Sequence, residues 1–145
     1  MPYKNLEINV TGYNSQHTDQ LTHYYKGFST TNPDSRGSKL YDFDLIKQDL
    51  LNHFNTRKGQ RLMNPKFGTI IWDTLMEPLT SEIKQLLTTD IREICNSDPR
   101  VYPTQIQVNE FERGFLIEIA LSMRNTNQTS TLRLMFDQKI GLAVQ

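Results

Sequence analysis

Four cations lie close together in the first half of the chain and suggest an anion-binding site. Arg57, Lys58 and Arg61 fall within five positions, and Lys66 follows shortly after. A phosphate cradle needs several glycines and a helix that begins directly after them, so that backbone amides converge on the ligand. The sequence around Gly59 has neither feature. Two interpretations stay open: a solvated helix C-terminus whose cations suit the helix dipole, and a structural loop.

Carboxylates are the second set of residues that could do chemistry. A glycosidase needs two of them across a sugar-binding cleft, one with a raised pKa. The candidates are Asp73, Glu77, Asp98, Glu110 and Glu118. Glu118 lies on the polar face of an expected strand, and an apolar pair of residues separates Asp73 from Glu77. None of them forms a recognisable catalytic pair, and we predict that the protein is not an enzyme.

Histidine and cysteine are scarce in this sequence. The three histidines and one cysteine show no metal-ligand spacing, so we predict neither a metal nor a cofactor. Cys95 lies beside Ile94 in an amphipathic stretch, which favours a buried small hydrophobe. Sixteen basic residues balance sixteen acidic ones, so no net charge draws the chain to nucleic acid or anionic lipid. No apolar stretch approaches the ~20 residues that span a membrane, and we expect a soluble, non-exported protein.

Two amphipathic helices are expected to position these residues. The first is predicted from Asp42, the expected N-cap, to about Asn55, because apolar residues recur at three- and four-residue steps. The second is predicted over residues 80–96, with Thr80 or Ser81 as its cap. Its expected buried stripe consists of Ile83, Leu86, Leu87, Ile91 and Ile94.

Strands follow the helices. Apolar and polar residues alternate over 104–111, 115–123 and 129–136, with short polar reversals between them, which predicts a three-stranded antiparallel meander. A short β-prone run, 69–72, lies between the helices. Two helices followed by these strands predict an α+β fold, in which both helices pack on one face of a small antiparallel sheet.

The N-terminal part has a different composition. It is rich in Ser, Thr, Asn and Gly and has no clear period beyond a short alternation at residues 6–10. We therefore divide the chain into an N-terminal arm, 1–39, partly extended, and a domain, 40–145. The arm's aromatic cluster is expected to dock on the protein's own core or on a neighbour, an alternative that stays open. It consists of Tyr24, Tyr25 and Phe28.

A triplet, Asp98-Pro99-Arg100, follows the second helix. Pro99 fixes its own φ near −65°, which holds its two charged neighbours in a defined relative geometry. A guanidinium presented in this way can bind a carboxylate with two parallel hydrogen bonds. The alternative is a local pair between Arg100 and Asp98, or an internal capping contact.

The triplet and the cationic loop together form a recognisable pattern. The loop supplies Thr56, Gly59 and Arg61, followed by Pro65, Phe67 and Gly68. A Thr, a Gly and an Arg in a tight loop, then Pro-x-Phe-Gly, then a helix closed by an acidic-Pro-Arg triplet, resembles the baseplate wedge and sheath-initiator family of contractile-tailed bacteriophages. The resemblance runs from about residue 40 to the C-terminus. The family usually has Glu where this chain has Asp98, so the carboxylate here sits on a shorter arm.

The resemblance implies a structural role in a virion. Such a protein joins the helical bundle of the baseplate wedge to the first sheath ring and initiates sheath assembly by β-strand pairing. Its implied partners are large wedge proteins, the tail sheath protein, and tail tube or hub proteins, with assembly in the host cytoplasm. Asp98, Pro99 and Arg100 are implied to contact the wedge bundle. The implied structural loop comprises Thr56, Arg57, Gly59, Arg61, Pro65, Phe67 and Gly68, with Arg61 in an ion pair.

An edge strand offers a mechanism for the sheath contact, because its unpaired N–H and C=O groups can accept a strand of another chain. The expected edge is the last strand, 129–136, followed by a tail to residue 145, and residues 6–10 are the next candidate. The residues assigned to this pairing are Leu132, Leu134 and Phe136. Two other functions stay open: a tail-associated muralytic, lysozyme-like hydrolase, and a free-standing adaptor domain unrelated to tails.

Overall fold

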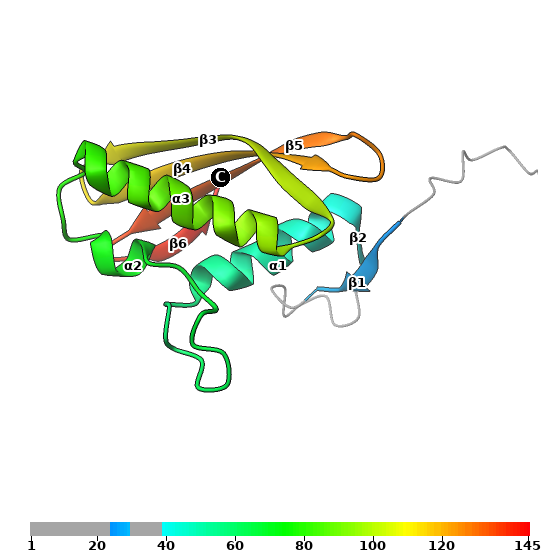
Figure 1. Ribbon diagram of the computed structural model, residues 1–145, viewed down its shortest axis with the longest axis horizontal. Helices are drawn as coiled ribbons and strands as arrows, with labels where there is room; N and C mark the ends of the chain where they lie inside the picture. The colour runs from blue at the N-terminus through cyan, green and yellow to red at the C-terminus, as the bar shows by residue number, and fades with distance from the viewer. Residues whose placement is uncertain (1–23, 30–38) are drawn as a thin grey trace, which may run out of the picture.

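The computed structural model describes residues 24–29 and 39–145 (Figure 1). This part of the chain contains three helices and six strands, and the strands form two antiparallel sheets. The helices are α1 (Asp42–Asn55), α2 (Ile71–Thr74) and α3 (Ser81–Ser97). The strands are β1 (Lys26–Phe28), β2 (Lys39–Tyr41), β3 (Val101–Phe111), β4 (Gly114–Met123), β5 (Thr129–Asp137) and β6 (Gly141–Val144).

The main sheet has four strands in the order β3-β4-β5-β6, all antiparallel. The predicted meander is therefore present, but the expected tail forms a fourth strand. A tight turn explains the difference: the Asp137 carboxylate accepts hydrogen bonds from the amides of Lys139 and Ile140 at 2.7 and 3.2 Å. Gly141 then adopts a φ of 90°, which reverses the chain onto β5. Strand β6 has only four residues, too few to show a clear alternation in the sequence.

One apolar core lies between the sheet and the helices (Figure 1). Alternate residues of β4, from Phe115 to Met123, point into it together with alternate residues of β5. The same core includes Ile46, Leu50 and Phe54 of α1 and Leu87, Ile91 and Ile94 of α3. Both long helices thus cover one face of the sheet, which confirms the predicted α+β class. The opposite face carries polar residues such as Gln107, Glu118 and Arg133.

The two long helices confirm the predicted apolar periodicity and correct two residues. Thr80 caps α3, and its hydroxyl accepts a hydrogen bond from the Ile83 amide at 3.3 Å. Leu86, however, is 53% exposed and lies outside the buried stripe. Asp42 is the first residue of α1 rather than its N-cap, and has a φ of 47°. Its carboxylate accepts hydrogen bonds from the backbone amides of Tyr24 and Tyr25.

The β-prone run 69–72 is not a strand, because tertiary contacts override its local preference. Thr69 makes a single parallel bridge to Arg57, and the chain then turns into the short helix α2. The indole N–H of Trp72 donates to the Phe54 carbonyl at 2.8 Å. Its ring meets the Phe136 ring edge-on at 5.2 Å. The indole thus ties α2 to both α1 and the sheet.

Residues 24–29 form part of a second, two-stranded sheet with β2. Gly27 lies so close to α1 that a Cβ there would come within 2.4 Å of Leu45 Cδ1. Tyr25 packs against the protein's own core, while Tyr24 and Phe28 are exposed. One aromatic of the arm therefore docks internally. The predicted strand at residues 6–10 lies outside the described residues.

Candidate docking surfaces

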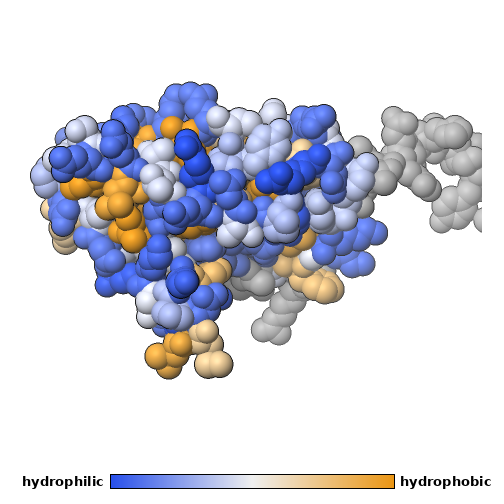
Figure 2. Space-filling view, viewed as in Figure 1, coloured by the Kyte–Doolittle hydropathy of each residue, from blue (hydrophilic) through white to orange (hydrophobic). Residues whose placement is uncertain are grey.

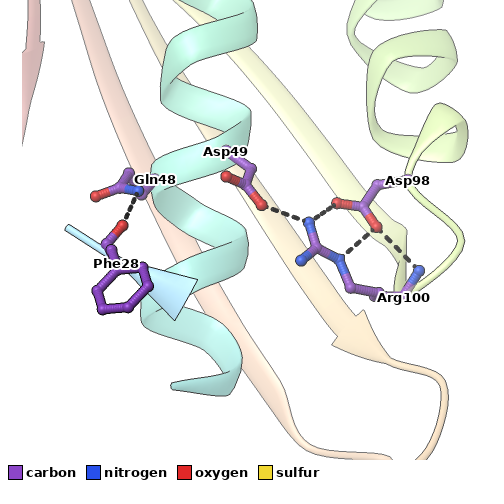
Figure 3. Close-up of polar contacts among 5 residues, drawn as sticks. All are labelled: Phe28, Gln48, Asp49, Asp98 and Arg100. Atoms are coloured by element: carbon purple, nitrogen blue, oxygen red, sulfur yellow. Dashed lines mark hydrogen bonds and ion pairs between the residues drawn. The ribbon is translucent and has the colours of Figure 1, made fainter. Parts of the chain in front are cut away.

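Arg100 is bound within the fold and does not project toward solvent (Figure 3). Its Nε donates to Asp98 Oδ1 at 2.9 Å and its Nη2 to Asp98 Oδ2 at 2.6 Å. Nη2 also contacts Asp49 Oδ2 on α1 at 2.7 Å. The Arg100 side chain is only 21% exposed. The structure therefore contains the local Arg100–Asp98 pair that the sequence left open as an alternative. Asp49 of α1 is the third member of this ion-pair cluster.

This pairing controls the protonation of both partners. Burial raises the pKa of Asp98, but the side-chain and backbone hydrogen bonds from Arg100 outweigh it and hold this pKa below its ordinary value of 3.8. The same hydrogen bonds to Asp98 raise the pKa of Arg100. The carboxylate and the guanidinium are therefore both charged at neutral pH, and they tie the end of α3 to α1.

A groove of about 330 Å³ lies beside this ion pair. It runs between α1, the end of α3 and the loop that connects α1 to α2. Pro99 is exposed at its margin, and Phe67 contributes from the loop. The residues that line it are Asp49, Leu50, His53, Phe67, Ser97, Asp98, Pro99 and Arg100. The two sequence motifs thus meet at one surface feature.

The loop between α1 and α2 is held by its own backbone. The Gly59 amide donates to the Pro65 carbonyl at 2.9 Å, and the Thr69 amide donates to the Thr56 carbonyl at 2.9 Å. Gly59 and Gly68 have φ angles of 85° and 119°, a region that disfavours other residues. A Cβ at Gly68 would also come within 2.7 Å of the Thr56 carbonyl oxygen. Both glycines are therefore required by the path of the backbone.

Phe67 joins the loop to α1 through stacked side chains. Its ring lies on the His53 ring with centroids 3.9 Å apart, and the Arg61 guanidinium lies 3.9 Å from the Phe67 centroid. The expected ion pair of Arg61 is thus replaced, among the described residues, by a cation–π contact. Burial is the main effect on His53 and lowers its pKa, which favours the neutral ring.

Asp90 is the residue that sequence reasoning missed. It lies on α3, is 5% exposed, and its Oδ2 accepts hydrogen bonds from the Thr69 hydroxyl at 2.7 Å and the Ile70 amide at 3.2 Å. Its Oδ1 faces Lys58 Nζ at 3.3 Å. The carboxylate therefore fixes both sides of the loop to α3. A signal exists in the sequence, since Asp90 is three residues after Leu87 and four before Ile94, on the apolar stripe itself.

The cationic cluster is largely explained by such contacts. Lys58 pairs with Asp90, and Arg57 Nε lies 3.3 Å from Asp73 Oδ1. Arg61 stacks on Phe67. Lys66 is exposed and makes no ion pair with any other described residue. Three of the four cations therefore make contacts within the domain.

The residues assigned to sheath pairing are core residues. Leu132, Leu134 and Phe136 are each at most 1% exposed. Strand β5 is also not the edge over its whole length, because β6 pairs with residues 134–137. The expectation that 129–136 forms the outer edge is therefore wrong for the second half of that strand. The outer strands of the sheet are β3 on one side and β6 on the other.

The carboxylates considered for catalysis are paired with arginines or lie on separate elements. Asp73 pairs with Arg57 beside the loop, whereas Glu118 pairs with Arg133 on the polar sheet face at 3.3 Å. Burial raises the pKa of Cys95 to about 12, so its thiol is protonated. Across residues 24–29 and 39–145, no cluster of His, Cys, Asp and Glu could hold a metal ion. Within the same residues, no helix is long and apolar enough to cross a membrane.

The described residues thus form a two-layer α+β domain with a fixed loop, an internally paired arginine after its long helix and open sheet edges, which can accept contacts from other subunits. Comparison with known families agrees. The model of the family described as "Baseplate wedge protein gp25" matches residues 42–128, and the chain belongs to this family. It is accordingly a structural component of the tail baseplate of a virion.

Among the solved structures that share the fold is a protein from Geobacter sulfurreducens described as a candidate tail lysozyme. It is 24% identical, with a TM-score of 0.54, over 62% of this chain and 85% of that one. At this identity the likeness concerns the fold alone. No curated protein sequence matches the chain.

Proposed function

We propose that this chain joins the helical bundle of the baseplate wedge to the first sheath ring, and that it initiates the sheath by accepting a strand along its C-terminal sheet edge. Membership of the baseplate wedge family supports the location. The observation that carries the mechanism is the unequal protection of the two outer strands, β3 and β6.

Strand β3 carries features that discourage pairing. Pro103 lacks an amide proton, and the register shifts between Pro103 and Gln105. Strand β6, Gly141–Val144, has neither a proline nor a charged residue. Natural proteins use such features to protect edges that must stay free, so the four-residue β6 edge, which has neither of them, is the one better suited to pairing.

The free backbone groups of this edge can be assigned. The Gln145 amide donates to the Arg133 carbonyl, so residues 145, 143 and 141 turn their backbone groups toward β5. The intervening residues, Leu142 and Val144, turn theirs outward. Val144 is also 53% exposed, so its side chain leaves room for a neighbouring strand. A sheath strand added here extends the sheet beyond β6.

For the wedge contact, we propose the groove beside Pro99, with a revised role for Arg100. The guanidinium is already bound to Asp98 and Asp49, so it shapes the surface and does not reach across an interface. Exposed Pro99 and the ring of Phe67 then supply the contact surface for a helix of the bundle. We also propose that residues 40–145 form the baseplate wedge and sheath-initiator domain, and that residues 1–39 form an N-terminal arm.

We infer that this role is structural and not muralytic. The carboxylates considered for catalysis lie on separate elements, and three of them, Asp73, Asp98 and Glu118, are paired with arginines. A retaining or inverting glycosidase needs its two carboxyl groups roughly 5–10 Å apart across a cleft. The candidate tail lysozyme from Geobacter sulfurreducens shares the fold, but a sequence identity of 24% is too low to assign its activity to this chain.

Val144→Pro tests the sheath mechanism. It removes one outward N–H but none of the hydrogen bonds between β5 and β6, so the domain should fold and an incoming strand should lose a backbone partner. Tails assembled with this variant are expected to show a complete baseplate and tube with a missing or misplaced sheath in electron micrographs. Val144→Ala, which keeps the N–H, should give normal sheaths. Full-length sheaths on Val144→Pro baseplates would contradict pairing at β6.

A further inference from the structure

The loop between α1 and α2 ends in an apolar tip that the contacts described so far do not use. Leu62 and Met63 are 96% and 98% exposed, the highest values among the large apolar residues of the described chain. The loop projects from the body of the domain, and its end is apolar in Figure 2. Single exposed apolar residues are common, but two adjacent ones at the end of a projection are a candidate contact.

The tip stands on an ordered base. The bond from the Gly59 amide to the Pro65 carbonyl closes the loop just below it, and the Phe67 amide donates to the Asn64 carbonyl at 3.1 Å. The stack of Arg61 on Phe67 and of Phe67 on His53 joins the base to α1. The loop therefore loses little conformational entropy when a partner binds the tip, which favours binding.

The charges around the tip define the partner. Arg57 and Lys58 are paired with Asp73 and Asp90, but Arg61 and Lys66, which flank the tip, have no carboxylate partner among the described residues. Both are exposed. An apolar tip between two unpaired cations is complementary to an apolar pocket with an acidic rim.

We propose that Leu62 and Met63 insert into an acid-rimmed apolar pocket on a large wedge protein, and that Arg61 and Lys66 meet the carboxylates of the rim. This rests on the proposed function, because the wedge protein is the partner that the function supplies. The tip lies on the same loop as Phe67, which lines the groove beside Pro99, so one loop serves both proposed contacts. Side chains that fill a well-packed, fully desolvated pocket are the ones that carry most of the binding energy of an interface.

The test is the affinity of the purified full chain for the large wedge protein encoded with it, measured by surface plasmon resonance. The double variant Leu62→Ser, Met63→Ser should keep the wild-type melting temperature and bind at least about 30-fold more weakly. Lys66→Glu should slow association at low salt, and the difference from wild type should shrink at high salt. Leu86→Ser is the matched control, since it removes an exposed leucine from α3 instead of the loop.

The outcomes separate the two proposals. Wild-type binding that survives the double variant, or that Leu86→Ser weakens equally, would contradict the tip contact and leave the proposed function standing. A wild-type chain that does not bind the wedge protein would contradict both. Sedimentation with phosphatidylglycerol–phosphatidylethanolamine vesicles that depends on Leu62 and Met63 would assign the tip to a membrane, and would also overturn the protein pocket.

Discussion

Replacing Asp90 with alanine is expected to lower the free energy of unfolding by about 3–5 kcal/mol. The side chain is 5% exposed and accepts from the Thr69 hydroxyl and the Ile70 amide. Its removal leaves these buried donors without an acceptor and opens a cavity under the loop. Urea denaturation of the variant and the wild type measures the difference.

Two further variants separate the roles of this carboxylate. Asp90→Asn keeps an oxygen for Thr69 and Ile70, and should cost only about 1–2 kcal/mol. Lys58→Ala removes a partner that is 39% exposed, and should cost less than about 1 kcal/mol. If Lys58→Ala were as damaging as Asp90→Ala, the ion pair and not the hydrogen bonds to the loop would hold this region together.

Arg100→Ala is expected to cost about 2–4 kcal/mol of stability, less than a fully buried pair because Asp49 remains partly open to water. The variant leaves the Asp98 carboxylate, 12% exposed, without its guanidinium. The measurement is again urea denaturation. Arg133→Ala is the matched control, because its partner Glu118 lies on the open sheet face and the pair should be worth under about 1 kcal/mol.

The pH dependence identifies the cause. Because Arg100 lowers the pKa of Asp98 below 3.8, this stabilisation is fully present above that pH and is lost as the pH falls through the lowered pKa. The stability gap between wild type and Arg100→Ala should therefore narrow in acid. A gap that stays constant from pH 7 down to the acid unfolding of the wild type would show that Arg100 acts through packing and not through the Asp98 carboxylate.

Local periodicity was sufficient to predict the long helices and three strands, because their apolar residues repeat at the spacing of the elements themselves. Asp90 escaped notice, although a charged residue on an apolar stripe is a readable sign of a buried partner. The prediction that Leu86 is buried was wrong for the opposite reason. Its apolar side chain fits the stripe by type, but it lies at the exposed flank of the helix. The pattern of the sequence cannot distinguish these two cases without the packing.

Contacts between distant residues were beyond sequence reasoning. Arg100 and Asp49 are separated by 51 positions, and only the packing of α1 against α3 brings them together. The same limit applies to β6, whose pairing depends on the turn at Asp137 and not on its own short sequence. The resemblance at the motifs was correct for the family, and of the two alternatives left open for Arg100 the structure contains the local pair with Asp98.

A cryo-EM map of the junction between baseplate and sheath tests the central claim most directly. The claim predicts a strand of the sheath protein beside β6, with its backbone hydrogen-bonded to Leu142 and Val144. A first sheath ring that contacts this chain elsewhere, with the outward groups of Leu142 and Val144 left to solvent, would contradict it.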